Sequence, residues 1–175
     1  MATLFVDKID PQSGTSLEIG SSGDTVNLAG NVGTGFPTNE AEFSVIIAGS
    51  GSTNIATSTA TIIPFGSEEF DPDGVFNTST YKFTAPSAGK YFFSWCVRKA
   101  DFTSNRFYID IKKNSTGVGT FETGVGSSVY GSVGGTILLD LAQNDTVHGE
   151  VVHNQGGTQA ITNNNTRFFG FKLIG

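Results

Sequence analysis

The 175-residue chain has a formal net charge of −6, and 37% of its residues are hydrophobic, which is enough apolar material for one globular core. Its 23 glycines, with abundant Ser, Thr and Asn, favour turns and strands over helices. With 10 basic residues against 16 acidic ones, the chain lacks the electrostatic footprint of a nucleic-acid-binding protein. No apolar run suits membrane insertion and no signal peptide is recognisable. The single cysteine excludes an internal disulfide, so we expect synthesis in a reducing cytoplasm.

The first 34 residues differ from the rest of the chain. They carry half of the net negative charge, and short apolar pairs recur there at a spacing of two, each followed by turn-forming residues. This segment is too thin to bury its own apolar side chains, so it is either disordered or an arm completed by strands of other chains. We favour the arm, and predict an N-terminal anchoring arm over 1–34 and one domain over 35–175. The apolar residues expected to dock the arm are Leu4, Val6, Ile9, Leu17, Ile19, Val26 and Leu28.

From about residue 40 onward the patterns are those of β-strands. Runs of alternating or continuous apolar residues are separated by Gly, Pro, Asn and Asp, and none has helical periodicity over three turns. Strands are predicted over 43–47, 62–65, 81–84, 91–97, 106–112, 127–133, 136–141, 146–152 and 167–174. Loops are predicted over 49–56, 71–74, 156–159 and 163–165. The pattern indicates an all-β sandwich or barrel of eight to ten short strands.

The run over 91–97 is aromatic on both faces, which is typical of a buried central strand. Tyr91, Phe93 and Trp95 alternate and project to one side, where they can fill an inter-sheet core about 10 Å thick. Phe92 then lies on the opposite face. Such a surplus of aromatic residues favours a subunit interface, although one large single-chain core is the alternative.

No arrangement of residues is typical of an active site, so we expect neither an enzyme nor a cofactor. His148 and His153 are five apart, on or beside one predicted strand, so they face opposite sides and form no two-histidine metal pair; we expect both at the surface or rim. Cys96 lies in the most apolar strand and is expected to be a buried, unreactive thiol. Asp71 and Asp73 are the weak candidates for a calcium site, and a plain turn is favoured over it.

An extended series of residues resembles the signature of the complement C1q globular head, in the C1q/TNF-like jelly-roll superfamily. That signature is an aromatic residue, Asn or Asp, a second aromatic, Phe, and then Gly-x-Tyr-x-Phe-x-aromatic. Trp95 stands where Phe or Tyr is usual, and Phe169-Gly170-Phe171 is similar to the closing strand of the family. Trp95 is thus the departure, and the seven positions that match the signature are Phe65, Asp71, Phe76, Phe83, Gly89, Tyr91 and Phe93.

This resemblance covers about residues 40–175 and implies an all-β jelly-roll sandwich of eight to ten antiparallel strands, which forms a homotrimer with aromatic strands along its threefold axis. For a ligand or receptor face only regions can be named, 49–57, 113–120 and 153–165. The residues expected to pack the core or the trimer interface are Phe65, Phe76, Phe83, Tyr91, Phe93, Trp95, Phe169 and Phe171.

The segments 6–11 and 17–26 are similar to the openings of tail-fibre and virion-surface proteins of marine bacteriophages. Together the two resemblances imply a non-enzymatic trimeric virion protein, such as a fibre, knob or capsid decoration, made in the host cytoplasm. Its arm would dock on other virion proteins, and its loops would contact a host-surface glycan or protein. The alternative is a secreted or cell-surface bacterial ligand-binding domain of the same fold.

Overall fold

The computed structural model describes residues 22–23, 25, 40–100, 106–123 and 130–173. The chain divides into two units, Met1–Phe36 and Pro37–Gly175, and the fold described below is that of the second unit. All seven predicted docking residues of the arm, from Leu4 to Leu28, lie outside the described residues, and so does the first part of the strand predicted over 127–133.

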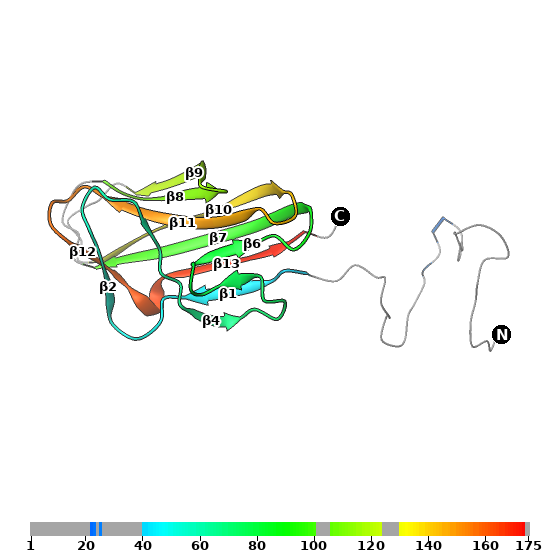
Figure 1. The fold of residues 1–175 in the computed structure, drawn as a ribbon, viewed down its shortest axis with the longest axis horizontal. Coiled ribbons are helices and arrows are strands. Elements are labelled where there is room, and N and C mark those ends of the chain that lie inside the picture. The colour runs from blue at the N-terminus through cyan, green and yellow to red at the C-terminus, as the bar shows by residue number, and fades with distance from the viewer. Residues whose placement is uncertain (1–21, 24, 26–39, 101–105, 124–129, 174–175) are drawn as a thin grey trace. The chain divides into compact units, whose positions relative to one another are not determined.

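The described part of the second unit consists of strands and one short 3₁₀ helix, η1 (Asn163–Asn165) (Figure 1). The strands are β1 (Phe43–Ile46), β2 (Ser52–Ile55), β3 (Thr61–Ile62), β4 (Ser67–Phe70), β5 (Phe76–Asn77), β6 (Lys82–Thr84), β7 (Gly89–Ala100), β8 (Phe107–Lys113), β9 (Thr116–Thr123), β10 (Tyr130–Leu141), β11 (Thr146–His153), β12 (Gln159–Thr162) and β13 (Arg167–Lys172).

These strands form two antiparallel sheets. In the first sheet the order is β2-β12-β7-β13-β1-β4. β12 and β13 pair with successive parts of β7, and β10 pairs with β7 along its whole length. In the second sheet the order is β5-β6-β11-β8-β9, with β3 paired to β11. Apolar side chains of both sheets form one core between them. This arrangement confirms the predicted all-β antiparallel sandwich.

Thirteen strands appear in the described residues, which is more than the predicted eight to ten. β10 is one continuous strand where two were predicted, and β2, β4, β5, β9 and β12 were missed. The missed strands are short, polar or rich in glycine; β9 contains no buried residue, and β2 contains only Ile55. Ladder hydrogen bonds to neighbours that are distant in sequence hold such strands, so their own side-chain pattern does not reveal them.

Aromatic side chains fill the centre of the core. Tyr91, Phe93 and Trp95 are buried on the inward face of β7. Phe168 of β13 stacks on Trp95, with ring centroids 4.2 Å apart, and meets the ring of Phe43 edge-on at 4.8 Å. Stacked and edge-on aromatic pairs of this kind contribute beyond their buried area, so this cluster fixes the distance between the two sheets.

Three expectations about polar side chains are wrong. Cys96 is exposed, because it follows Trp95 on β7 and therefore points out of the sandwich. His148 and His153 are both buried rather than at the rim. The imidazole Nε2 of His153 lies 2.9 Å from the carbonyl oxygen of Ile55, so this side chain ties the 55–58 segment to β11.

Candidate interaction face

The outward face of the second sheet is charged. Arg106 makes a two-point ion pair with Glu122, at 2.6 and 2.9 Å, and its guanidinium lies 4.4 Å from the ring centroid of Tyr108. Farther along the strands, Lys112 binds the carboxylate of Asp110 at 2.5 Å. The side chains of Arg106 and Glu122 are about half exposed, so this part of the face suits contact with water.

The outward face of the first sheet is apolar across two neighbouring rows. In the first row, Phe92 lies between Leu138 and Phe171 in the strand register. In the second row, Phe169 and Phe70 flank Ser44. Leu138 is 62% exposed and Phe70 is 50% exposed, whereas the phenylalanine rings between them are half-buried. We call Phe70, Phe92, Leu138, Phe169 and Phe171 the apolar face.

A hollow of about 500 Å³ lies on the β4 side of this face. It is lined by Ser44, Glu69, Phe70, Arg167 and Phe169. The Ser44 hydroxyl donates to Glu69 at 2.7 Å, and the Arg167 guanidinium donates to the same carboxylate at 2.6 Å. The hydrogen bond from Ser44, with the contribution of Arg167, holds the pKa of Glu69 below its ordinary value. The polar groups of the hollow therefore satisfy one another.

The structure divides the predicted packing residues into two sets. Six of them lie in the interior of the single chain, namely Phe65, Phe76, Phe83, Tyr91, Phe93 and Trp95. Phe169 and Phe171 lie on the apolar face instead. Leu138 and Phe70 also lie on the apolar face but are not among the predicted packing residues. Strand alternation places Leu138 outward, but the apolar residues on both sides of it conceal that signal.

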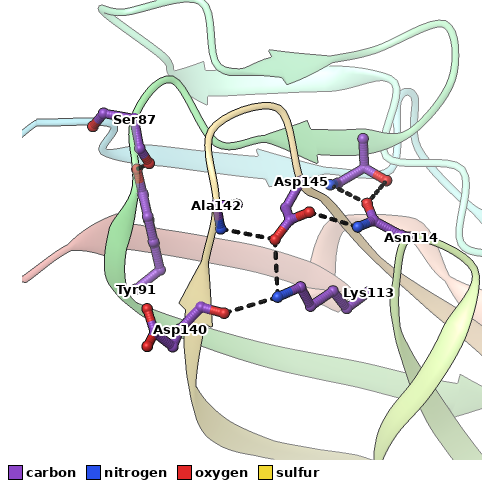
Figure 2. Close-up of polar contacts among 8 residues, drawn as sticks. Ser87, Tyr91, Lys113, Asn114, Asp140, Ala142 and Asp145 are labelled. Carbon is purple, nitrogen blue, oxygen red and sulfur yellow. Dashed lines mark hydrogen bonds and ion pairs between the residues drawn. The ribbon is translucent and has the colours of Figure 1, made fainter.

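A polar network closes one end of the sandwich, where β8, β10 and β11 turn (Figure 2). Asp145 accepts hydrogen bonds from the side chains of Lys113 and Asn114 and from the Ala142 backbone, at 2.6 to 2.8 Å. These donors, Lys113 first, lower the pKa of Asp145 to about 2. Since the carboxylate oxygens are already bonded within the fold, the network joins two turns rather than offering a ligand site.

The regions considered for a receptor face lie at both ends of the sandwich. The 49–57 and 153–165 regions come together, because β2 pairs with β12 and the Asn163 side chain binds Thr53 at 2.8 Å. We call this the far end. The turn at Asn114 and Ser115 lies at the opposite end, where Glu40 accepts a backbone hydrogen bond from Lys172. We call this the entry end.

Asp71 and Asp73, the weak candidates for a calcium site, lie in a turn that is closed by a hydrogen bond from the Gly74 amide to the Asp71 carbonyl at 3.2 Å. The Asp71 carboxylate accepts hydrogen bonds from the backbone N–H groups of Val75 and Phe76, at 2.9 and 2.8 Å, and Asp73 accepts one from Ala41 at 2.8 Å. Across the described ranges, no group of three or more His, Cys, Asp or Glu side chains is placed to hold a metal ion. No helix in the described part of the chain has the length and apolarity to cross a membrane.

Solved structures of other proteins have a similar fold. The globular domain of zebrafish complement 1qA is 20% identical, with a TM-score of 0.57, over 77% of this chain and 98% of that one. The Eiger TNF of S. frugiperda is 9% identical, with a TM-score of 0.60, over 76% and 92% of the two chains. Murine APRIL is 10% identical, with a TM-score of 0.58, over 78% and 100%.

No curated protein matches the chain. The family model of the C1q domain matches residues 43–173, which is most of the second unit. The two-sheet sandwich, the aromatic core and this match agree with the resemblance carried by the series from Phe65 to Trp95. The chain therefore belongs to the C1q domain family.

Proposed function

We propose that this chain is a non-enzymatic structural protein of a bacteriophage virion, in which the C1q domain forms a homotrimer through the apolar face. C1q domains are generally non-enzymatic binding domains, and domains of the C1q and TNF type typically trimerise. The observation that carries the trimer is the contrast between the two outward faces, one charged and one apolar.

The apolar face is too extensive for a side of the sandwich that stays in water. Leu138 and Phe70 are both at least half exposed, and three further phenylalanines connect them into one surface. Burial of apolar area contributes about 25 cal/mol per Å², and large connected apolar patches are typical of protein interfaces. In a closed ring of three copies, each copy contacts two neighbours through different parts of its surface. A face that reaches from Leu138 on β10 to Phe70 on β4 supplies both parts.

The arm over 1–34 supports the virion part of the proposal. Its resemblance to openings of phage tail-fibre and virion-surface proteins, its acidic charge and its paired apolar residues suit docking by added strands. It is joined to the domain at the entry end, where Glu40 lies beside Lys172. In this proposal the arm docks on other virion proteins, and the loops of the far end contact a host-surface glycan or protein. Display of three copies would convert weak single contacts into useful avidity.

The trimer is tested by Leu138→Asp. A buried carboxylate at each contact opposes association, so we expect the solution mass to fall from three chains to one while the circular dichroism of the strands stays the same. Val118→Asp is the matched control, because Val118 is an exposed apolar residue of β9 in the other sheet. We expect it to leave the mass at three chains.

Cys96 provides a second measurement in the same samples, because it is the only cysteine and points outward from the sheet that carries the apolar face. Its alkylation by a maleimide should be slow in the wild type and in Val118→Asp, and fast in Leu138→Asp. A wild-type protein with the mass of one chain would contradict the proposed function. A folded Leu138→Asp variant that stays trimeric would show that the apolar face is not the interface.

A further inference from the structure

His148 lies at a seam between two short edge strands. Its strand, β11, pairs with β8 along nearly its whole length. On its other side, β11 pairs with β6 at Thr146 and Val147, and with β3 at Glu150 and Val151. His148 lies between these two short pairings. Its side chain is only 2% exposed, although strand alternation places it on the outward side of the sheet.

The surroundings of His148 suit a neutral imidazole. Its Nε2 lies 3.4 Å from a carboxylate oxygen of Glu150, and its Nδ1 is buried without a hydrogen-bond partner. Lys112 lies directly across on β8, where it binds Asp110 at 2.5 Å and Glu150 at 3.7 Å. From β6, Lys82 acts on the ring electrostatically. The residues of β3, Thr61 and Ile62, carry no titratable group.

Protonation of the His148 imidazole would therefore place a positive charge where its surroundings stabilise it poorly. It would add an N–H donor at the buried Nδ1, which has no hydrogen-bond partner, while the Glu150 carboxylate beside Nε2 is shared with Lys112. Burial, with the contributions of Lys82 and Lys112, lowers the pKa of His148 from its ordinary value, and Glu150 acts against this shift. A ring that is released to solvent binds the proton more readily, so the open form gains relative to the closed form as the pH falls below about 6.5.

The segment between β3 and β6 reaches the apolar face. Between β3 and β6 the chain crosses to the first sheet as β4, where Glu69 and Phe70 line the hollow. Both ends of the segment are held at the seam: the Ile63 amide donates to the Gly149 carbonyl at 3.1 Å, and β6 is paired to β11. Loosening of these two attachments frees the connections on both sides of β4.

We propose that His148 is an acid-sensitive latch: its protonation loosens β3 and β6 from β11 and, through β4, weakens the apolar face that holds the copies together. The effect on assembly rests on the proposed homotrimer, whereas the local loosening does not. One coupled proton allows the population of the open form to grow by up to about tenfold per pH unit below the ordinary histidine range.

Hydrogen exchange on the full-length protein tests the latch. After correction for the intrinsic rate, we expect protection of the Ile63 amide to fall by up to about fivefold between pH 6.5 and pH 5.5, while the amide of Ile109 in β8 is unchanged. His148→Gln, which stays neutral, should remove this loss. His153→Gln is the matched control, because His153 is the other buried histidine of β11, and it should retain the loss. The same acid loss in His148→Gln, or its disappearance in His153→Gln, would overturn the proposal.

Two further variants keep the test decisive if His148→Gln does not fold. Lys82→Gln removes a repelling cation and should reduce the acid loss, whereas Glu150→Gln removes the attracting anion and should increase it. Shifts in the same direction would overturn the latch.

Solution mass at pH 7.5 and 5.5 separates the two proposals. One chain at both values overturns the trimer alone, and a trimer that persists at pH 5.5 despite local loosening overturns the coupling through β4.

Discussion

Trp95 combines favourable packing with an unmet hydrogen bond. Its indole ring stacks on Phe168 at an angle of 11°, but its Nε1 is buried without an acceptor. Gly149 makes room for it, since a Cβ at that position would lie 3.0 Å from Nε1. A smaller side chain without an N–H donor at position 95 would therefore lose packing contacts. It would also remove the free-energy cost of the buried, unpaired N–H group.

We expect Trp95→Phe to change the free energy of unfolding by less than about 1.5 kcal/mol, because a buried unpaired donor costs about 1–3 kcal/mol and offsets much of the lost packing. Trp95→Ala should cost about 3–5 kcal/mol, because it leaves a large cavity in the core. Urea denaturation at one fixed chain concentration measures both variants. Equal losses in the two variants would contradict the proposed penalty at Nε1.

At the scale of the element, the path of β10 beside β7 depends on a glycine. A Cβ at Gly134 would lie 2.3 Å from the backbone oxygen of Trp95, and no side-chain movement can relieve that contact. Gly117 in β9 differs, because a Cβ there would meet only side-chain atoms at 3.7 Å or more. The two glycines therefore form a matched pair for the same substitution.

We expect Gly134→Ala to destabilise the protein by about 1–3 kcal/mol, as overpacking does, and to weaken the trimer because β10 carries Leu138. Gly117→Ala should change the free energy of unfolding by less than about 1 kcal/mol. Thermal or urea unfolding and solution mass measure both effects. Similar losses in the two variants would mean that β10 can shift without cost.

The elements predicted from sequence are those whose own side chains record burial. β8 alternates buried and partly exposed residues, and β7, β11 and β13 contain runs rich in apolar or aromatic residues, so the existence of these strands and the sandwich follow from their apolar patterns. β9 and β2 are held by ladder partners, which no local pattern encodes. The candidate site divides in the same way. Phe169 and Phe171 stand out by their spacing, but the exposure of Leu138 depends on which strand lies at the sheet edge, and this is a property of the topology.

At the scale of the whole molecule, the division between arm and domain separates two tasks. The core residues, from Phe43 to Phe168, and the apolar face, from Phe70 to Phe171, all lie in the second unit. Folding and self-association should therefore need nothing from residues 1–34. Docking on other virion proteins is proposed for those residues alone.

Deletion of residues 1–34 tests this division. We expect the remaining chain to have the circular dichroism of the full-length domain and the solution mass of three copies, because its core and apolar face are complete. In phage particles assembled with the truncated chain in place of the full one, the protein should be absent from the purified particle. The Val118→Asp chain, with its arm intact, is the control that should be incorporated.

A truncated chain with the mass of one copy would show that the arm drives assembly. A truncated trimer that still joins the particle would place virion docking on the C1q domain. Absence of the full-length protein from particles would instead favour the secreted or cell-surface ligand-binding domain.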